Sequence, residues 1–322
     1  MVKKFVYGTP FETEAVVKEI PSSEGNPDYG TFSTENGFSF TTKLADDDMV
    51  FGLGEANRGI NKRGFLYISD CADDPNHVES KTSLYAAHNF IIISGKTHVG
   101  FFFDYPGTLR FDIGYTTSDT MTVSCENADL YVYMITGDSD LDIVKQFRGI
   151  IGRSYIAPKF AFGYGQSRWG YKTEDDFRTV VKKYRENHVP LDMVYMDIDY
   201  MQDYKDFTVN EERFPDFEGF VQDMKKEKIH LVPIIDAGVK VEEGYDIYEE
   251  GCEKGYFCRR EDGSYFEATV WPGWTHFPDV LNADARKWFG DKYDVLVSKG
   301  IDAFWNDMNE PSIFYSLSLI HI

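Results

Sequence analysis

The sequence has 322 residues, of which 42% are hydrophobic and 16% aromatic, enough to bury the core of one large or two ordinary domains. Its formal net charge is −21, from 54 acidic and 33 basic residues. This excess of acid argues against a surface that binds nucleic acid phosphates or an anionic membrane. No run of about 18 apolar residues is present, so we expect no membrane-spanning helix.

The cysteines and the N-terminal residues bear on the compartment. Cys71, Cys125, Cys252 and Cys258 are scattered and form no CxxC pair, so a zinc site is not expected. Free thiols suit a reducing compartment. The N-terminus has two lysines but no long apolar run after them, unlike a secretory signal. The sequence therefore predicts a cytoplasmic protein.

The first 157 residues predict an antiparallel β-sandwich. Short β-rich runs alternate with turn residues, without a helical period between them. Many short strands of this kind are typical of two packed antiparallel sheets. The clearest runs span residues 37–44, 89–95, 98–107 and 121–137.

Residues 138–152 predict a helix that leads into the next domain. Apolar residues recur there at helical spacing, and such a stripe is the face that a helix buries. The side chains expected on the buried face are Leu141, Val144, Phe147 and Ile151.

From Pro158 onward, strands alternate with helices. Alternation of this kind implies a parallel sheet with right-handed crossovers. Two architectures remain open, a doubly wound open sheet and a (β/α)8 barrel. No GxGxxG opens the first strand-to-helix turn and no GxxxxGKS/T occurs, so the usual nucleotide signals are missing. The strands are expected at residues 159–165, 191–199, 230–238 and 300–307.

Three helices between these strands have sequence signals. Thr173 and Asp176 have the spacing of a capping box at a helix start. A second helix has its apolar stripe at Phe217, Phe220, Val221 and Met224. A third helix is expected within residues 283–299.

Acidic residues follow three consecutive apolar strands. Asp197 and Asp199 come after the second strand, Asp236 after the third, and Asp307 and Glu310 after the fourth. In either architecture the active site lies at the carboxyl ends of the strands. Asp after a strand is also common as a helix cap or turn former, and for Asp199 we favour a structural hydrogen-bonding role.

Two kinds of chemistry fit such a rim of carboxylates. Glycoside hydrolysis uses two carboxyl groups and an oxocarbenium-like transition state, and the indoles of Trp169, Trp271, Trp274 and Trp305 could stack on sugar rings. A Mg²⁺ site could use the same oxygen ligands. The metal-dependent alternative is weaker, because no Lys or His base stands at an obvious strand end. A non-catalytic carbohydrate-binding remnant is a third possibility.

The stretch "FWNDMNEP" (304–311) resembles the nucleophile signature of glycoside hydrolase family 31, which includes α-glucosidases, isomaltases and α-xylosidases. Other stretches resemble family motifs in the same order, over roughly residues 40–315. The resemblance implies an N-terminal β-sandwich over residues 1–157, with a substrate loop near 70–82, and a (β/α)8 barrel beginning at 158. The further motifs are "FGLGE" (51–55), "PKFAFGYGQSRWGY" (158–171), "MDIDYM" (196–201), "PIIDAG" (233–238) and "VWPGWTHFPD" (270–279).

The resemblance also implies roles for individual residues. Asp307 would be the catalytic nucleophile, and Asp197 would bind hydroxyls of the sugar whose bond is cleaved. Asp236 would lie near the same subsite, Asp73 would reach toward the leaving-group side, and Glu310 would orient the end of the fourth strand. The remaining substrate-binding residues would be Ile198 and Ile235 at the ring edge and Trp271, Trp305 and Met308 in an apolar wall.

The substrate implied by the resemblance is an α-linked glucoside oligosaccharide, with α-xylosides as the alternative. Trp169 stands where relatives often have Tyr, which leaves the linkage preference open. Neither a cofactor nor a metal ion is expected.

The residues after position 311 do not resemble the family. The resemblance assigns the general acid/base to an Asp on a later strand, and only four of eight barrel strands are recognisable in residues 158–322. The last seven residues, "SLSLIHI", contain no turn or cap signal. We expect a truncated or misread gene end, and a chain that by itself is inactive or poorly soluble. The alternative is a genuine short tail on a degenerate protein.

Overall fold

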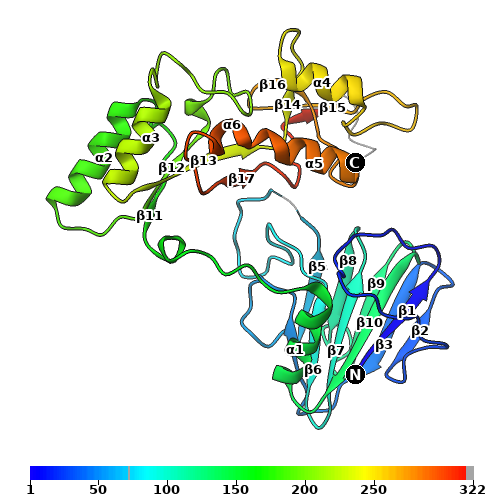
Figure 1. Ribbon diagram of the computed structural model, residues 1–322. Helices are drawn as coiled ribbons and strands as arrows, with labels where there is room; N and C mark the ends of the chain where they lie inside the picture. The colour runs from blue at the N-terminus through cyan, green and yellow to red at the C-terminus, as the bar shows by residue number, and fades with distance from the viewer. Residues whose placement is uncertain (72, 317–322) are drawn as a thin grey trace. The chain divides into compact units, whose positions relative to one another are not determined.

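A computed structural model describes residues 1–71 and 73–316 of the chain (Figure 1). The chain forms two compact units, one from Met1 to Tyr155 and one beginning at Ile156. The first is built mainly of strands, and the second mixes strands with helices. Among the described helices, none is both long and apolar enough to cross a lipid bilayer.

The first unit is a sandwich of two five-stranded antiparallel sheets, as the sequence predicts. The sheet orders are β1-β10-β7-β6-β4 and β2-β3-β9-β8-β5. Inward-facing side chains of both sheets share one core, in which the rings of Phe40 and Phe101 lie 4.7 Å apart. The first sheet comprises β1 (Val2–Tyr7), β4 (Met49–Gly52), β6 (Phe90–Ser94), β7 (His98–Asp104) and β10 (Leu130–Gly137). The second comprises β2 (Thr31–Ser33), β3 (Phe38–Lys43), β5 (Phe65–Ser69), β8 (Leu109–Ile113) and β9 (Thr120–Cys125).

Helix α1 (Asp140–Ile151) is present as predicted, but only half of the predicted apolar face packs on the sheet. Phe147 and Ile151 pack against buried Ile143 and Ile150, whereas Leu141 is 63% exposed and Val144 36% exposed. A Cβ on Gly100 of β7 would lie 2.6 Å from Ile143 Cγ2, so the glycine leaves room for this side chain. The predicted face is therefore wrong at Leu141 and Val144.

The second unit contains a parallel sheet in the order β11-β12-β13-β17. The order of strands in the sheet follows their order in the chain, as in successive strand–helix units. Helix α2 (Glu174–Glu186) lies between the first two strands in sequence, and α3 (Phe217–Lys226) between the next two. The strands are β11 (Gly165–Gln166), β12 (Met193–Met196), β13 (His230–Asp236) and β17 (Trp305–Asp307).

The first strand is much shorter than the buried strand predicted over 159–165. Residues Lys159–Phe162 form a 3₁₀ turn, η1, and only Gly165 and Gln166 pair with β12. Phe162 is 79% exposed. Because β11 lies at the edge of the described sheet, its preceding aromatic residues have no second neighbour strand to pack against. Phe160 instead stacks on His230, with ring centroids 3.5 Å apart.

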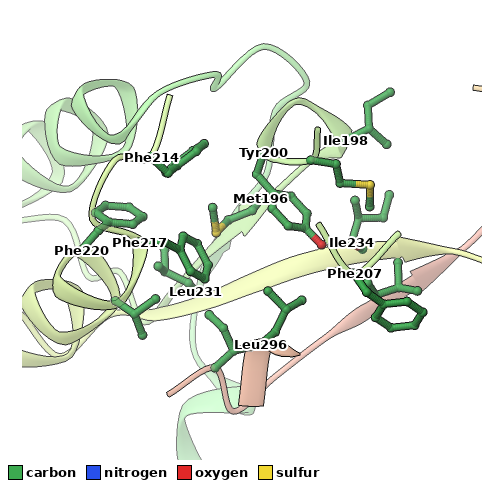
Figure 2. Close-up of a cluster of buried hydrophobic side chains, with 14 of the residues drawn as sticks. Met196, Ile198, Tyr200, Phe207, Phe214, Phe217, Phe220, Leu231, Ile234 and Leu296 are labelled. Carbon is green, nitrogen blue, oxygen red and sulfur yellow. Dashed lines mark hydrogen bonds between the residues drawn. The ribbon is translucent and has the colours of Figure 1, made fainter. Parts of the chain in front are cut away.

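The two helices beside this sheet form as the sequence predicts. Thr173 and Asp176 make both hydrogen bonds of a capping box at the start of α2. The stripe on α3 is buried against β12 and β13, where Figure 2 shows Phe217 and Phe220 in one cluster with Met196 and Leu231. These apolar contacts fix the helices on the sheet and so hold its strand ends in place.

A long segment between β13 and β17 contains α4 (Asp246–Lys254), two further helices and three of the four strands of a second sheet, whose fourth strand, β18, follows β17. The sheet has the order β14-β16-β15-β18 and is antiparallel in all its pairs. The predicted helix within 283–299 forms as α5 (Ala283–Lys292) and α6 (Asp294–Val297), separated at Tyr293. The sheet consists of β14 (Val239–Lys240), β15 (Glu267–Val270), β16 (Gly273–His276) and β18 (Tyr315–Ser316).

Loss of the α2 cap should destabilise the second unit. We expect Thr173→Ala to lower its free energy of unfolding by about 1 kcal/mol, because the backbone N–H of Asp176 loses its acceptor. The measurement is urea unfolding followed by tryptophan fluorescence. All tryptophans lie after Ile156, so this signal reports on the second unit.

Thr179→Ala is the matched control, because Thr179 is exposed on the same helix. The control should be neutral or slightly stabilising, since Ala has the higher helix propensity. Equal losses in the two variants would show that the cap does not contribute.

Candidate active site

Strand register brings together the acidic residues that follow the parallel strands. Asp236 of β13 is the direct pairing partner of Asp307 of β17. Asp197 follows β12, whose last residue, Met196, pairs with Pro233 of β13. Because carboxyl ends of parallel strands share one edge of a sheet, Asp197, Asp236 and Asp307 form one carboxylate cluster.

Burial and like charge dominate the electrostatics of the carboxylate cluster. Burial, followed by the charges of Asp307 and Asp197, raises the pKa of Asp236 to about 7. Burial also raises the pKa of Asp197, against a hydrogen bond from the backbone N–H of Ile198 and with smaller contributions from Asp199 and Asp307. A carboxyl group that keeps its proton near neutral pH can donate a hydrogen bond to a ligand as well as accept one.

Asp199 and Glu310 each have one buried carboxylate oxygen without a hydrogen-bond partner among the described residues. Asp199 is 1% exposed, and Arg213 donates to its backbone carbonyl at 2.8 Å and lies 3.4 Å from its carboxylate. This contact supports the structural role predicted for Asp199. Glu310 is half-buried, and its Oε2 atom has no hydrogen-bond partner within residues 1–71 and 73–316.

The apolar residues predicted to contact the sugar are neighbours in sequence of the carboxylate cluster, and most of them are buried. Ile198 and Ile235 are 4% and 2% exposed and belong to the core of the second unit (Figure 2 labels Ile198). Trp305 is half-buried and packs edge-on against Tyr195, with centroids 6.0 Å apart. Met308 is buried against the second sheet. Contact of these side chains with a sugar stays a prediction.

Trp169 and Trp271 are the exposed members of the predicted set. Trp169 is 65% exposed just after β11, and Trp271 is 48% exposed. The Trp271 ring meets Phe314 edge-on at 4.8 Å. Exposed indoles of this kind can stack on a sugar ring. Asp73 belongs to the first unit, and its role stays a prediction.

Sequence reasoning did not find Asp206. This residue is 1% exposed, and its Oδ1 accepts a hydrogen bond from the backbone N–H of Asp236 at 3.0 Å. It lies in the loop after η2 (Ile198–Tyr200), where no spacing or motif distinguishes it from neighbouring polar residues. Only its position in the loop after β12, at the carboxyl edge of the parallel sheet, could have suggested a role.

Within the described residues, no group of three or more His, Cys, Asp or Glu side chains is arranged to hold a metal ion. His276 is buried beside Phe257 and Tyr265, and burial lowers its pKa to about 4. It is a packed histidine.

Two family models match the chain. "Glycosyl hydrolases family 31 TIM-barrel domain" matches residues 154–320, and "Glycosyl hydrolase 31 N-terminal galactose mutarotase-like domain" matches residues 11–112. The chain belongs to glycosyl hydrolase family 31. Of the two architectures left open by the sequence, the parallel sheet is therefore part of a (β/α)8 barrel.

Curated relatives agree with this assignment. The chain is 37% identical over 277 residues to alpha-glucosidase 2 of Bacillus thermoamyloliquefaciens, covering 84% of this chain and 35% of the relative. It is 28% identical over 318 residues to an alpha-glucosidase of Saccharolobus solfataricus, covering 97% of this chain and 46% of the relative. The chain thus spans between a third and a half of the length of these two relatives.

Solved structures of the family have the same fold. A family 31 alpha-glucosidase from Bacteroides thetaiotaomicron has a TM-score of 0.79 at 26% identity, covering 88% of this chain and 48% of that one. A family 31 dextranase from Flavobacterium johnsoniae, complexed with isomaltotriose, has a TM-score of 0.80 at 24% identity, covering 87% and 34%. The predicted fold, a β-sandwich followed by the first strands of a barrel, is confirmed.

Removing the buried charge of Asp236 should make the second unit more stable at neutral pH. The raised pKa of Asp236 means that its ionisation is less favourable in the folded state than in the unfolded state, where the pKa is 3.8. The folded state is therefore most favoured below pH 3.8, and this advantage is lost as the pH rises to about 7. Asn cannot ionise. The advantage of Asp236→Asn should therefore grow by about 1.4 kcal/mol per pH unit between those values and then level off.

The measurement is urea unfolding at several pH values, followed by tryptophan fluorescence. Asp294→Asn is the control, because Asp294 is an exposed carboxylate in the same unit. A difference between Asp236→Asn and wild type that does not change with pH would contradict a buried, proton-holding Asp236.

Proposed function

We propose that this chain carries the nucleophile half of a retaining α-glycosidase that acts on α-linked glucosides. The observation that carries the proposal is the direct pairing of Asp236 with Asp307 at the carboxyl ends of β13 and β17, with Asp197 in the same electrostatic cluster. Membership of family 31 and the alpha-glucosidase relatives support the reaction class.

In the proposed reaction, one carboxylate oxygen of Asp307 attacks the anomeric carbon of the sugar. The C1–O bond to the leaving group breaks as the bond to Asp307 forms, and the leaving oxygen takes a proton from a general acid. Water then opens the glycosyl ester, so the configuration at C1 is retained. The resemblance assigns the general acid to a later barrel strand.

The other carboxyl groups have supporting roles in the proposal. The transition state gains positive charge at the sugar ring, and the carboxylate cluster lies where that charge develops. Asp197 would accept hydrogen bonds from sugar hydroxyls. Asp236, with its raised pKa, could donate to a hydroxyl while limiting the negative charge beside Asp307.

A second candidate is a protein that binds α-glucosides without cleaving them. The exposure of Trp169 and Trp271 favours a sugar-stacking surface whether or not chemistry follows. The two functions differ in one observable, which is a covalent bond to Asp307.

The free thiols at all four cysteines also support the proposal of a reducing, cytoplasmic compartment.

The proposal is tested with a 5-fluoro-α-glucosyl fluoride, because fluoride leaves without a proton and does not need the general acid. We expect the wild-type chain to gain one fluoroglucosyl group by intact-mass spectrometry, with the label on the peptide that contains Asp307. Asp307→Asn should gain none. The corresponding xylosyl reagent distinguishes an α-xylosidase, which it should label faster than the glucosyl reagent.

Asp302→Asn is the control for this experiment, because it changes an exposed carboxylate that precedes β17. This variant should be labelled like wild type. Reversible binding without an adduct would favour the non-catalytic candidate. Labelling of the Asp307→Asn chain at the wild-type rate would refute the assignment of the nucleophile.

A further inference from the structure

Asp206 is a buried carboxyl group that the proposed reaction does not use. It is 1% exposed, and its Oδ2 atom has no hydrogen-bond partner among the described residues. Its Oδ1 accepts the backbone N–H of Asp236 at 3.0 Å. A buried carboxyl without a cation is costly, so its presence under the carboxylate cluster needs an explanation.

Three tyrosine hydroxyls donate hydrogen bonds to Asp206 itself and to residues near the ends of β13 and β17. The hydroxyl of Tyr245 donates to the backbone carbonyl of Asp206 at 2.7 Å, and that of Tyr200 donates to the carbonyl of Ile234 in β13 at 2.8 Å. The hydroxyl of Tyr293 donates to the side chain of Asn306 in β17 at 2.6 Å. Asn306 immediately precedes the proposed nucleophile.

The titratable groups that face Asp206 from neighbouring elements are Tyr200, Tyr245, Tyr293 and Asp236, and the charge of Asp206 contributes to the raised pKa of each tyrosine. Burial, then Asp236, raises the pKa of Asp206 well above its usual range, against hydrogen bonds from two backbone N–H groups. The adjacent Lys205 is paired with Glu242 at 2.7 Å. Burial and like charge therefore both disfavour ionisation of Asp206 beside an ionised Asp236.

We propose that Asp206 is a positioning residue: by accepting the backbone N–H of Asp236 it holds this residue so that its side chain stays buried opposite Asp307. The hydrogen bond lies at the end of β13 and restrains the residue whose carboxyl group is proposed to lie beside the sugar. The effect on the reaction rests on the proposed function, whereas the effect on Asp236 does not. A misplaced catalytic group typically slows a reaction far more than it changes binding.

Two variants separate geometry from charge. Asp206→Ala removes the acceptor for the Asp236 N–H and leaves space for water beside that carboxyl group. Asp206→Asn keeps an acceptor of the same shape and, like the protonated acid, carries no charge. Asp203→Ala is the matched control, because Asp203 is exposed in the same loop.

The first readout is the pH midpoint at which the Asp236 carboxyl group titrates. It is measured by NMR on protein labelled with carbon-13 at its Asp carboxyl groups. The Asp236 signal is assigned as the one that disappears in Asp236→Asn. We expect Asp206→Ala to lower the midpoint by about one pH unit, because the Asp236 carboxyl becomes more hydrated. Asp206→Asn and Asp203→Ala should leave it unchanged. A wild-type midpoint in Asp206→Ala would overturn the proposal.

The second readout is the rate of covalent labelling at Asp307 by the fluoroglucosyl fluoride, per folded molecule. We expect a loss on the order of 10- to 100-fold in Asp206→Ala and recovery to within about two-fold of wild type in Asp206→Asn. An Asn variant as impaired as the Ala variant would overturn the proposal, because Asn retains the acceptor for the Asp236 N–H. So would an Ala variant that is less stable but labels at the wild-type rate.

Tyr245→Phe keeps the proposal testable if Asp206→Ala does not fold. It removes the hydrogen bond to the main chain of Asp206 and should lower the Asp236 midpoint by a smaller amount, while an unchanged midpoint would count against the proposal. If the wild-type chain is not labelled but the midpoints shift as expected, the proposed function fails and the positioning role stands. If labelling occurs and the midpoints do not shift, the positioning role fails and the proposed function stands.

Discussion

The candidate site depends on the parallel register between β13 and β17. Ile234 pairs with Trp305, Ile235 with Asn306 and Asp236 with Asp307. Successive side chains of a strand point to opposite faces, so a slip of one residue would place an isoleucine, not a carboxyl group, beside Asp307. The apolar residues that precede Asp236 are buried on both faces of the sheet, which makes such a slip costly. Core packing thus specifies the geometry of the site.

This register places like charges together, which opposes folding. The pKa of Asp236 rises because of burial and its acidic neighbours, and among the described residues Asp236 forms no ion pair with a cationic side chain. Protonation relieves the repulsion without a salt bridge. The tyrosine hydroxyls on the carbonyls of Ile234 and Asp206 restrain the backbone around the repelling groups. A backbone restrained by hydrogen bonds and a proton on one carboxyl group are two physical means of keeping the acidic side chains close together.

Features that depend on neighbours in sequence are predictable, whereas those that depend on distant contacts are not. The α3 stripe and the Thr173 cap are local patterns, and both form as predicted. The buried face of α1 depends on Gly100, some forty positions away, and the prediction failed there. The strand expected at 159–165 failed because its burial needs a second neighbouring strand. Asp206 was missed since its partner, Asp236, lies 30 residues away.

The same distinction explains why the reaction class follows from the chain more readily than the sugar. The proposed nucleophile, Asp307, and its acidic neighbours lie at strand ends, whose order the alternating pattern predicts. Recognition of a particular sugar depends on loops and exposed indoles such as Trp169 and Trp271, whose contacts come from several segments. A protonated Asp236 restricts the ligand in one respect. A hydrogen-bond donor beside the proposed nucleophile requires an acceptor on the ligand, and a sugar hydroxyl or ring oxygen supplies one. The chemistry of the carboxylate cluster thus suits polyhydroxylated ligands in general, and the surrounding loops must select among them.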